Sequence, residues 1–326
     1  MDGRVRGVVT VTALSAALVA VGSARGFAQE TSYWSQFSLA GAAAAAQDSM
    51  LGGKVPEKDA HQDSSRDRDV FEVKQVDVKP GQLKEELPVG EYAQPKWTTF
   101  RRFPGTRVYL QTPPGGVQFE QWIEFRKKKD KGGDDITRVR QELEFGLGNR
   151  MQLDLYMRHE HHRDGSSSTY DQVGYSAELR YALADWNEIW GNPTLYFEWV
   201  FNDAEADKIE PKLLLGGEIA PGWHWGSNFI HERSLAGHPD RTEEWAWSGS
   251  VSHTIVDDFF SVGATSTFSY ESEPGTPQRT HTTELLLGPS IQIIPHPRAA
   301  LNIEPLFGLT GESKRLKLFA VFSWHF

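Results

Sequence analysis

The sequence contains no cysteine and no apolar run long enough for a membrane-spanning helix. The absence of cysteine among the 326 residues excludes disulfides, thiolate metal sites, cysteine nucleophiles and a lipoprotein anchor. The longest apolar stretch, from Val8 to Val21, is shorter than the roughly 20 residues that such a helix needs. A basic excess is also missing, because the net charge is −10, so we expect no nucleic-acid partner.

The N-terminus has the pattern of a secretory signal peptide. Arg4 and Arg6 precede the apolar stretch, and small residues follow it, with Ala24 or Ala28 before plausible cleavage sites. We therefore predict that residues 1–28 are a signal peptide and that the mature chain is exported.

Aromatic residues are abundant, and the last eleven residues, LKLFAVFSWHF, show how they are arranged. On a strand, alternate side chains face opposite sides. One side here is wholly apolar and the other is mixed. The segment fits either a half-buried strand of a soluble sandwich or the closing strand of an outer-membrane β-barrel. It also resembles the C-terminal signal that the barrel-assembly machinery reads in bacterial outer-membrane proteins, here Leu318, Phe322, Trp324 and Phe326.

The same alternation recurs along the chain from about Gly116. Long polar connections alternate with short ones between these segments. Bacterial barrels have the same alternation, because their periplasmic turns are short and their extracellular loops are long. Residues 182–193, ALADWNEIWGNP, are the exception among the short connections. The candidate strands are 116–127, 135–147, 150–160, 170–183, 193–202, 208–219, 222–232, 243–254, 259–271, 280–293, 299–309 and 314–326.

These patterns predict an all-β fold, a transmembrane antiparallel up-and-down β-barrel of about 12 strands over residues 115–326, in the bacterial outer membrane. Residues 29–114 have an alanine-rich run, a polar stretch and several prolines. We predict a mostly disordered periplasmic extension there. A small plug inside the lumen is the alternative.

Many charged residues fall on the inward parity of the predicted strands. They could set a field along a water-filled pore, or they could pair across strands and fill a narrow barrel. The residues predicted to line the lumen are Glu120, Glu124, Arg126, Arg140, Glu142, Glu144, Asp154, Arg158, Glu178, Arg180, Glu198, Glu218, Glu304 and Lys317.

Aromatic residues on the other parity predict rings at the membrane interface, with core packing in a soluble protein as the alternative. The predicted interface aromatics are Trp223, Trp225, Trp245, Trp247, Trp324 and Phe326.

Two short motifs have residue types used in catalysis or metal binding. The sequence HEHH, from His159 to His162, could supply metal ligands, but a solvated loop explains it as well, and we predict no metal and no cofactor. Ser252 and His253 are adjacent on a strand and therefore face opposite sides, so they cannot pair directly as nucleophile and base. We predict no enzyme activity.

The segments QTPPGGVQFEQWIEFRK and RQELEFGLGNRMQLDLYMRHE resemble the outer-membrane family named for the MetA pathway of phenol degradation. The resemblance rests on Glu142, Gly146 and Arg150 and on the later GYSAELRYAL, and it extends over residues 115–326. It implies a porin-like barrel and the passage of hydrophobic or aromatic compounds.

These observations together favour a passive outer-membrane channel whose partners are membrane lipids and small solutes. The alternatives are a structural or adhesion barrel with a closed lumen and, less favoured, a lipid-acting enzyme.

Overall fold

The computed structural model describes residues 83–129, 135–164, 167–202, 206–235, 241–273 and 281–326. The predicted signal peptide and residues 29–82 of the predicted extension lie outside these ranges. Within them, no helix is long and apolar enough to cross a bilayer.

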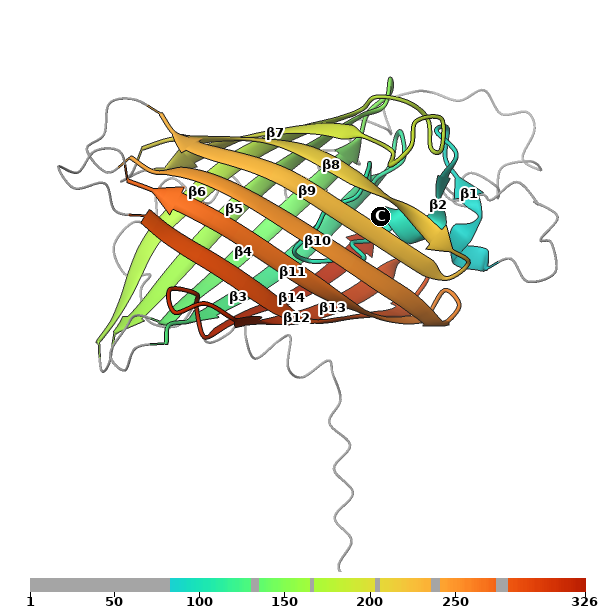
Figure 1. The fold of residues 1–326 in the computed structure, drawn as a ribbon. Coiled ribbons are helices and arrows are strands. Elements are labelled where there is room, and N and C mark those ends of the chain that lie inside the picture. Colours follow the sequence, from blue (N-terminus) through green and yellow to red (C-terminus); the bar gives the residue numbers. More distant parts are fainter. Residues whose placement is uncertain (1–82, 130–134, 165–166, 203–205, 236–240, 274–280) are drawn as a thin grey trace, which may run out of the picture. The chain divides into compact units, whose positions relative to one another are not determined.

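Twelve antiparallel strands, β3 to β14, form a closed barrel in which each strand pairs with its sequence neighbours and β14 pairs with β3 (Figure 1). This confirms the predicted fold and number of strands. The strands are β3 (Val117–Lys127), β4 (Asp135–Gly146), β5 (Met151–Asp164), β6 (Ser167–Ala182), β7 (Thr194–Asn202), β8 (Lys208–Ala220), β9 (Trp223–Ser234), β10 (Glu243–Val256), β11 (Phe260–Ser272), β12 (His281–His296), β13 (Ala299–Gly308) and β14 (Leu316–His325).

The two faces of the barrel differ in chemistry. On β7, Tyr196 and Glu198 face inward and are buried, whereas Leu195, Phe197 and Trp199 face outward and are exposed. A soluble monomer does not expose an apolar surface that continues around a whole barrel. Hydrocarbon outside the strands and polar groups inside them account for the pattern.

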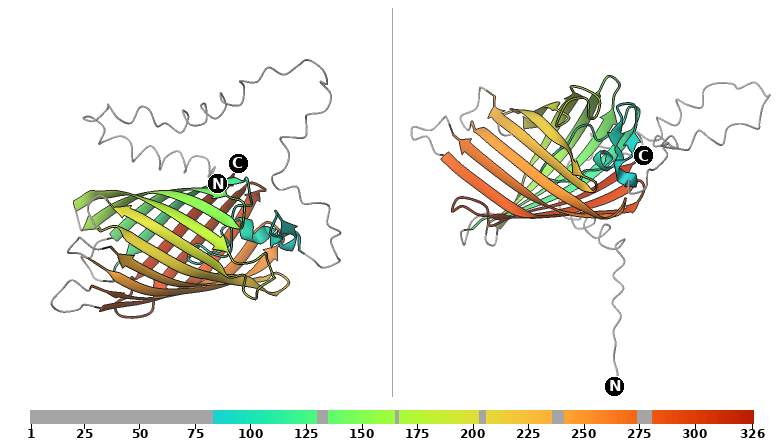
Figure 2. Two further views of the ribbon diagram at one scale, coloured as in Figure 1. Left: turned by 90° about the horizontal axis from the view of Figure 1, so that it is seen from above. Right: turned by 45° about the vertical axis from the view of Figure 1, so that its right-hand side comes forward.

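The connections at the two ends of the barrel also differ. At one end, strands are joined by short turns such as residues 147–150 and 221–222, with residues 183–193 the longer exception. The opposite end carries the longer connections, including residues 128–134 and 309–315. Figure 2 shows the two ends of the tilted strands. We call them the short-turn end and the long-loop end.

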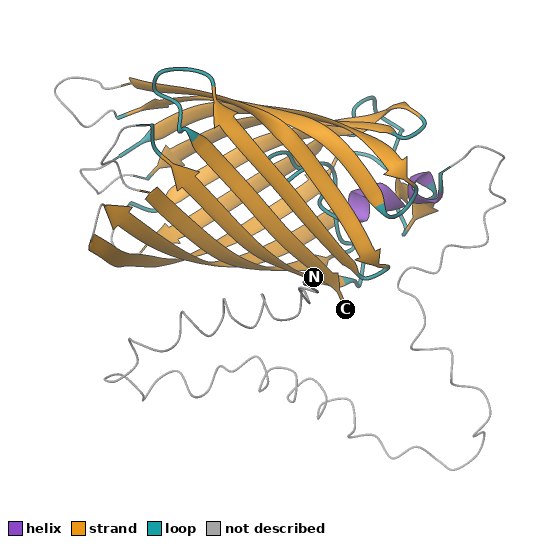
Figure 3. Ribbon diagram, turned by 90° about the horizontal axis from the view of Figure 1, so that it is seen from below, coloured by secondary structure: helices purple, strands orange, loops and turns teal. Residues whose placement is uncertain are grey.

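Residues 83–116 form a folded segment inside the barrel at its short-turn end, where Figure 3 shows two short helical turns. We call residues 83–116 the plug. Its elements are η2 (Lys84–Glu86), β1 (Pro88–Val89), β2 (Gln94–Pro95) and η3 (Lys96–Thr99).

The expectation of a mostly disordered extension is therefore wrong for residues 83–114, and the alternative, a lumenal plug, describes them. The prolines at positions 88 and 95 lie in the two-residue strands β1 and β2 instead of marking a flexible linker. The local sequence does not reveal this because the partners of the segment lie on the distant strands of the wall.

Candidate functional site

All the charged residues predicted to line the lumen lie on the inward parity of their strands. Near the plug they are fully buried: Glu120, Glu142, Glu144, Asp154, Arg180 and Glu304 have no exposed surface, and Glu178 has 1%. Glu218 lies at the short-turn rim and is exposed, but it accepts a hydrogen bond from Trp97 Nε1 at 3.0 Å. These charges face the lumen and form ion pairs there, and a field along a water-filled pore stays a prediction.

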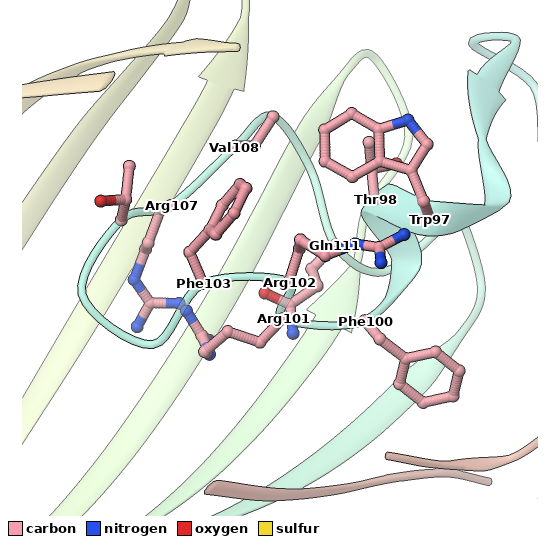
Figure 4. Close-up of a pocket in the computed structure, with 10 residues that line it drawn as sticks. Trp97, Thr98, Phe100, Arg101, Arg102, Phe103, Arg107, Val108 and Gln111 are labelled. Atoms are coloured by element: carbon pink, nitrogen blue, oxygen red, sulfur yellow. The ribbon is translucent and has the colours of Figure 1, made fainter. Parts of the chain in front are cut away.

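Arg101 of the plug joins three carboxylates of the wall. Its Nε lies 2.6 Å from Glu120 Oε2, and its Nη2 lies 3.0 Å from Glu144 Oε1 and 3.3 Å from Glu142 Oε1. Figure 4 shows Arg101 on the loop that follows η3. A carboxylate removed from water needs such a partner, because an unpaired buried charge is very unfavourable. Arg101 of the plug therefore supplies the cation for Glu120, Glu142 and Glu144, whereas wall Arg180 pairs with the neighbouring Asp154 and Glu178.

Arg107 makes a second set of ionic contacts farther along the plug. Its Nη2 lies 3.2 Å from Glu142 Oε1 and 3.5 Å from Glu178 Oε2, and it donates to the Tyr156 hydroxyl at 2.6 Å. Burial alone would lower the pKa of Arg107, but the carboxylate of Glu178 and the neighbouring acidic groups raise this pKa well above its usual value. Arg107 is therefore charged at every accessible pH.

Neutral hydrogen bonds hold the backbone of the plug against the wall. Gln152 Oε1 accepts from the backbone N–H groups of Gln111 and Thr112, at 2.7 and 3.0 Å. Asn228 accepts from the N–H of Arg107 and donates to its carbonyl, each at 2.7 Å. Ser250 donates to Thr106 Oγ1, also at 2.7 Å. These contacts come from β5, β9 and β10, so they hold the plug in one position within the lumen.

Val108 fits against two glycines of the wall that face each other on β8 and β9. A Cβ atom added to Gly216 would come within 2.5 Å of Val108 Cγ1, and one added to Gly226 would come within 2.8 Å of Val108 Cγ2. Real Cβ atoms do not approach so closely, so this notch exists only because both wall residues lack a side chain.

An aromatic cluster closes the short-turn end. Trp186, from the long turn at residues 183–193, meets Trp97 edge-on at 5.8 Å between ring centroids and meets Tyr109 at 5.2 Å. The Tyr109 hydroxyl donates to the carbonyl of Ala184 at 2.8 Å, and the backbone N–H of Trp186 donates to the carbonyl of Tyr92 at 3.0 Å. This turn, the longest at the short-turn end, packs against the plug.

Toward the long-loop end, most of the paired inward charges are half-buried, although Glu124 is only 7% exposed, and they pair within or between strands. Arg138 lies 2.7 Å from Glu160, and Lys208 lies 2.8 Å from Glu232. Glu124 is contacted by Arg126, Arg138 and Lys317. Water therefore reaches this half of the lumen, which we call the vestibule, whereas the plug excludes water from the other half.

Two groups of three carboxylates are close enough for a metal ion by distance: Glu120, Glu142 and Glu144, and Glu142, Asp154 and Glu178. Arginine guanidiniums already contact both groups. Arg180 lies 2.8 Å from Asp154 and 2.5 Å from Glu178. The arrangement favours internal ion pairs over a bound cation.

Each of the two short motifs is divided between the inward and outward faces of its own strand. His162 Nε2 lies 3.1 Å from Glu160 on the inward side of β5, while His159 and His161 share the other parity. Ser252 is buried on the inward side of β10, whereas His253 stacks on Trp223 outside. Ser252 and His253 thus form no nucleophile–base pair.

The aromatics predicted at the membrane interface lie on the outward parity. Trp223, at the short-turn end of β9, is 43% exposed, and Trp245, at the long-loop end of β10, is 58% exposed. Trp225, Trp247, Trp324 and Phe326 share the outward parity of their strands or their continuation, as do Leu318 and Phe322.

The sequence analysis missed the residues of the plug that hold it in the lumen, above all Arg101, Arg107, Trp97 and Trp186. The excess of glutamate on the inward parity was the available signal. Among the described residues of the wall, no Lys or Arg forms an ion pair with Glu120, Glu142 or Glu144, and their cation comes from the plug.

No family model matches the chain, and no curated protein matches it. The resemblance to the phenol-degradation family therefore stays a prediction. Among solved structures, an outer membrane channel from Pseudomonas putida F1 is similar, with a TM-score of 0.50 and 13% identity over 67% of this chain and 98% of that one. The porin NanC aligns with a TM-score of 0.42 and 13% identity, over 64% and 97% of the chains. The outer membrane protein Omp33 of Acinetobacter baumannii aligns with a TM-score of 0.33 and 9% identity, over 65% and 99%. At these identities the likeness shows the fold alone.

Proposed function

We propose that the protein is an outer-membrane channel for small solutes and that the plug must shift before solutes pass. The supporting observation is the way the plug is held. Besides the aromatic cluster and the apolar contacts of Val108 and Phe100, it contacts the wall through ion pairs and hydrogen bonds, as at Arg101, Arg107 and Asn228. A lumen lined by polar groups accepts water once such a segment moves, whereas a dry apolar core would not.

The vestibule supports the same proposal. Several of its charged side chains, such as Arg138 and Lys208, are partly exposed and paired, which supports a hydrated long-loop half of the lumen. The plug lies at the short-turn end of the lumen, and inward wall side chains such as Trp122 and Phe319 pack in a buried cluster of their own. With the short turns in the periplasm, as in bacterial barrels, the plug closes the periplasmic half.

A reversible lock tests the proposal directly. Ser250 Oγ and Thr106 Oγ1 are 2.7 Å apart, which places the two side chains close enough for an engineered disulfide. Because the chain has no cysteine, the double variant Thr106→Cys/Ser250→Cys contains only this pair. In planar bilayers the oxidised variant should be silent, and dithiothreitol should restore the discrete conductance of the unmodified protein.

The single variants Thr106→Cys and Ser250→Cys are matched controls and should conduct whether oxidised or reduced. A folded protein that stays silent under reducing conditions, with the unmodified chain equally silent, would contradict a channel. It would favour the second candidate, a structural barrel with a permanently closed lumen. The complete burial of Glu120, Glu142 and Glu144 beneath the plug is the observation that favours this candidate.

We also infer that the chain reaches the outer membrane through the barrel-assembly machinery, which would read the apolar parity of β14. Phe326 is 63% exposed at the end of this strand. Replacing it with alanine should lower the yield of folded barrel in outer membranes, while the outward Phe307→Ala on β13 should leave the yield near that of the unmodified chain.

A further inference from the structure

A cavity at the short-turn end lies between the plug and the rim of the barrel. Its volume is about 640 Å³, and small-molecule sites in proteins have volumes of about 300–1,000 Å³. The plug contributes Glu91 and Tyr92 to its lining, and the turn between β4 and β5 contributes Asn149 and Arg150. The remaining lining residues come from the ends of β5 and β6 and from the long turn at residues 183–193. The cavity is therefore large enough for a ligand and is shared by plug and wall.

One side of the cavity is formed by residues that face lipid. Met151 of β5 and Tyr181 of β6 are cross-strand partners on the outward parity, and both lie at the short-turn ends of their strands. Tyr181 is 38% exposed, and Trp190 of the neighbouring long turn is 82% exposed. Exposed tyrosine and tryptophan at the ends of membrane strands are typical of the boundary between hydrocarbon and headgroups. The cavity therefore lies at the level of the lipid headgroups.

The rest of the lining is polar and carries charges of both signs. Arg150 Nη1 lies 3.3 Å from Asp185 Oδ1, and a side-chain hydrogen bond joins Arg150 to Tyr181. The side chains of Arg150 and Asp185 are 36% and 38% exposed, so a ligand can reach the guanidinium. Glu91 is exposed and has no ion-pair partner within the described part of the chain. A cation and an unpaired carboxylate thus line the same cavity.

Arg150 has a backbone conformation that is unfavourable for its residue type. Asn149 and Arg150 both have a φ of 58°. In tight hairpin turns, glycine and asparagine adopt positive φ most readily, because a Cβ atom is crowded there. Asn149 suits this conformation, whereas Arg150 stands where glycine would fold more easily. Strained residues of this kind are concentrated at functional sites, so the side chain of Arg150 has a use that offsets the strain.

Tyr92 connects the cavity to the plug. It is 5% exposed and packs in the aromatic cluster with Trp97, Tyr109 and Trp186. Its hydroxyl has no hydrogen-bond partner among the residues that the structure describes. Buried hydroxyls are nearly always paired, and an unpaired one costs free energy. A polar occupant of the cavity would supply the missing partner.

We propose that this cavity binds the headgroup of a phospholipid with a primary ammonium group, from the periplasmic leaflet of the membrane. Arg150 donates to the phosphate oxygens, and the carboxylate of Glu91 accepts from the ammonium group. The acyl chains lie along Met151 and Tyr181. A trimethylammonium headgroup has no N–H to donate to Glu91, and a glycerol headgroup has no cation. The site rests on the orientation with the short turns in the periplasm, and it requires no conduction.

Dioctanoyl phospholipids are the probes, titrated into the full chain folded in non-ionic detergent and counted by native mass spectrometry. The phosphatidylethanolamine should bind saturably as a single molecule per chain. The phosphatidylcholine and the phosphatidylglycerol should bind at least about tenfold more weakly, since each lacks the charge-assisted hydrogen bond to Glu91. Glycerophosphoethanolamine, which has the headgroup without acyl chains, should compete at least about tenfold less well than the lipid because it buries no apolar chain.

Two variants separate the two ends of the headgroup. Glu91→Gln should weaken phosphatidylethanolamine binding at least about tenfold and leave phosphatidylglycerol binding unchanged. Arg150→Gln should weaken the binding of both lipids, because both carry the phosphate. Arg298→Gln is the matched control, since Arg298 is an exposed arginine of another short turn and does not line the cavity, and its affinity should change less than about twofold. Heat-modifiable gel mobility establishes that each variant is folded.

Equal binding of the three lipids, or unchanged phosphatidylethanolamine affinity in a folded Glu91→Gln or Arg150→Gln, would overturn the site. So would equal competition by glycerophosphoethanolamine, because the ligand would then be a soluble molecule and not a lipid. Selective phosphatidylethanolamine binding by a protein that never conducts would refute the channel and leave the site standing. Conduction without selective lipid binding would do the reverse.

Discussion

The Nε atom of Arg101 lies 2.6 Å from Glu120 Oε2, and the two side chains are 1% and 0% exposed, although one belongs to the plug and the other to the wall. Neither charge would be tolerable there without the other, since burial removes the hydration that stabilises an ion. Plug and barrel therefore stabilise each other. The closed lumen depends on a small number of contacts, each of which can be removed by a single substitution.

Replacing Arg101 with methionine should release the plug. Glu120, Glu142 and Glu144 would lose their shared cation, and removing one partner of a buried ion pair costs about 3–5 kcal/mol. We expect larger and more frequent openings in planar bilayers and faster proteolysis of the plug. Arg298→Met, in the short turn between β12 and β13, removes the same charge outside the lumen and should leave both properties unchanged. Identical traces for the two variants would contradict the anchoring role.

A single methyl group at Gly226 should displace the tip of the plug without changing any charge. The added Cβ would meet Val108 Cγ2 at 2.8 Å and Thr106 Cγ2 at 3.0 Å, both of them plug atoms. Conductance of Gly226→Ala should rise above that of the unmodified chain. Adding Val108→Ala removes the closer contact and should return the conductance part of the way. If the double variant conducts more than Gly226→Ala, the notch does not position the plug.

Two tryptophans of one turn give a matched pair for the aromatic cluster. Trp186 is 7% exposed and packs on Trp97 and Tyr109, whereas Trp190 is 82% exposed. Trp186→Ala should destabilise the docked plug by about 3–5 kcal/mol, the usual cost of truncating a buried tryptophan. Trypsin should then cleave the chain at Lys96, Arg101 or Arg102, which the docked plug protects. Trp190→Ala should be cleaved at the rate of the unmodified protein.

The outward face should be sensitive to charge according to depth. Ile303 lies in the middle of β13, and Phe307 lies near its long-loop end. Arginine at a mid-depth position facing lipid costs about 2–4 kcal/mol, against about 0–1 kcal/mol near the interface. Folding equilibria in phospholipid vesicles, measured in denaturant, should show Ile303→Arg strongly destabilised and Phe307→Arg nearly unaffected. An equal loss of unfolding free energy in the two variants would contradict the placement of β13 against lipid hydrocarbon.

The sequence by itself determined the wall of this barrel. Alternation is a local property with a period of two residues, so the parity of Leu316, Phe322 and Trp324, and with it the lipid face, can be read from neighbouring residues alone. The positions of the strands and the inward direction of Glu142 and Asp154 followed from the same pattern, and the alternating connection lengths indicated the two ends.

Only the tertiary structure decided what fills the lumen. The sequence of the plug has no regular hydrophobic period, because its side chains contact partners on many strands. Arg101 contacts β3 and β4, and Val108 contacts Gly216 and Gly226. Trp97 contacts Trp186 of the long turn. Contacts between residues so distant in the chain leave no local pattern. The placement of Arg140 directly opposite Arg158 likewise exists only once the register of β4 and β5 is fixed, since cross-strand neighbours are set by pairing in space.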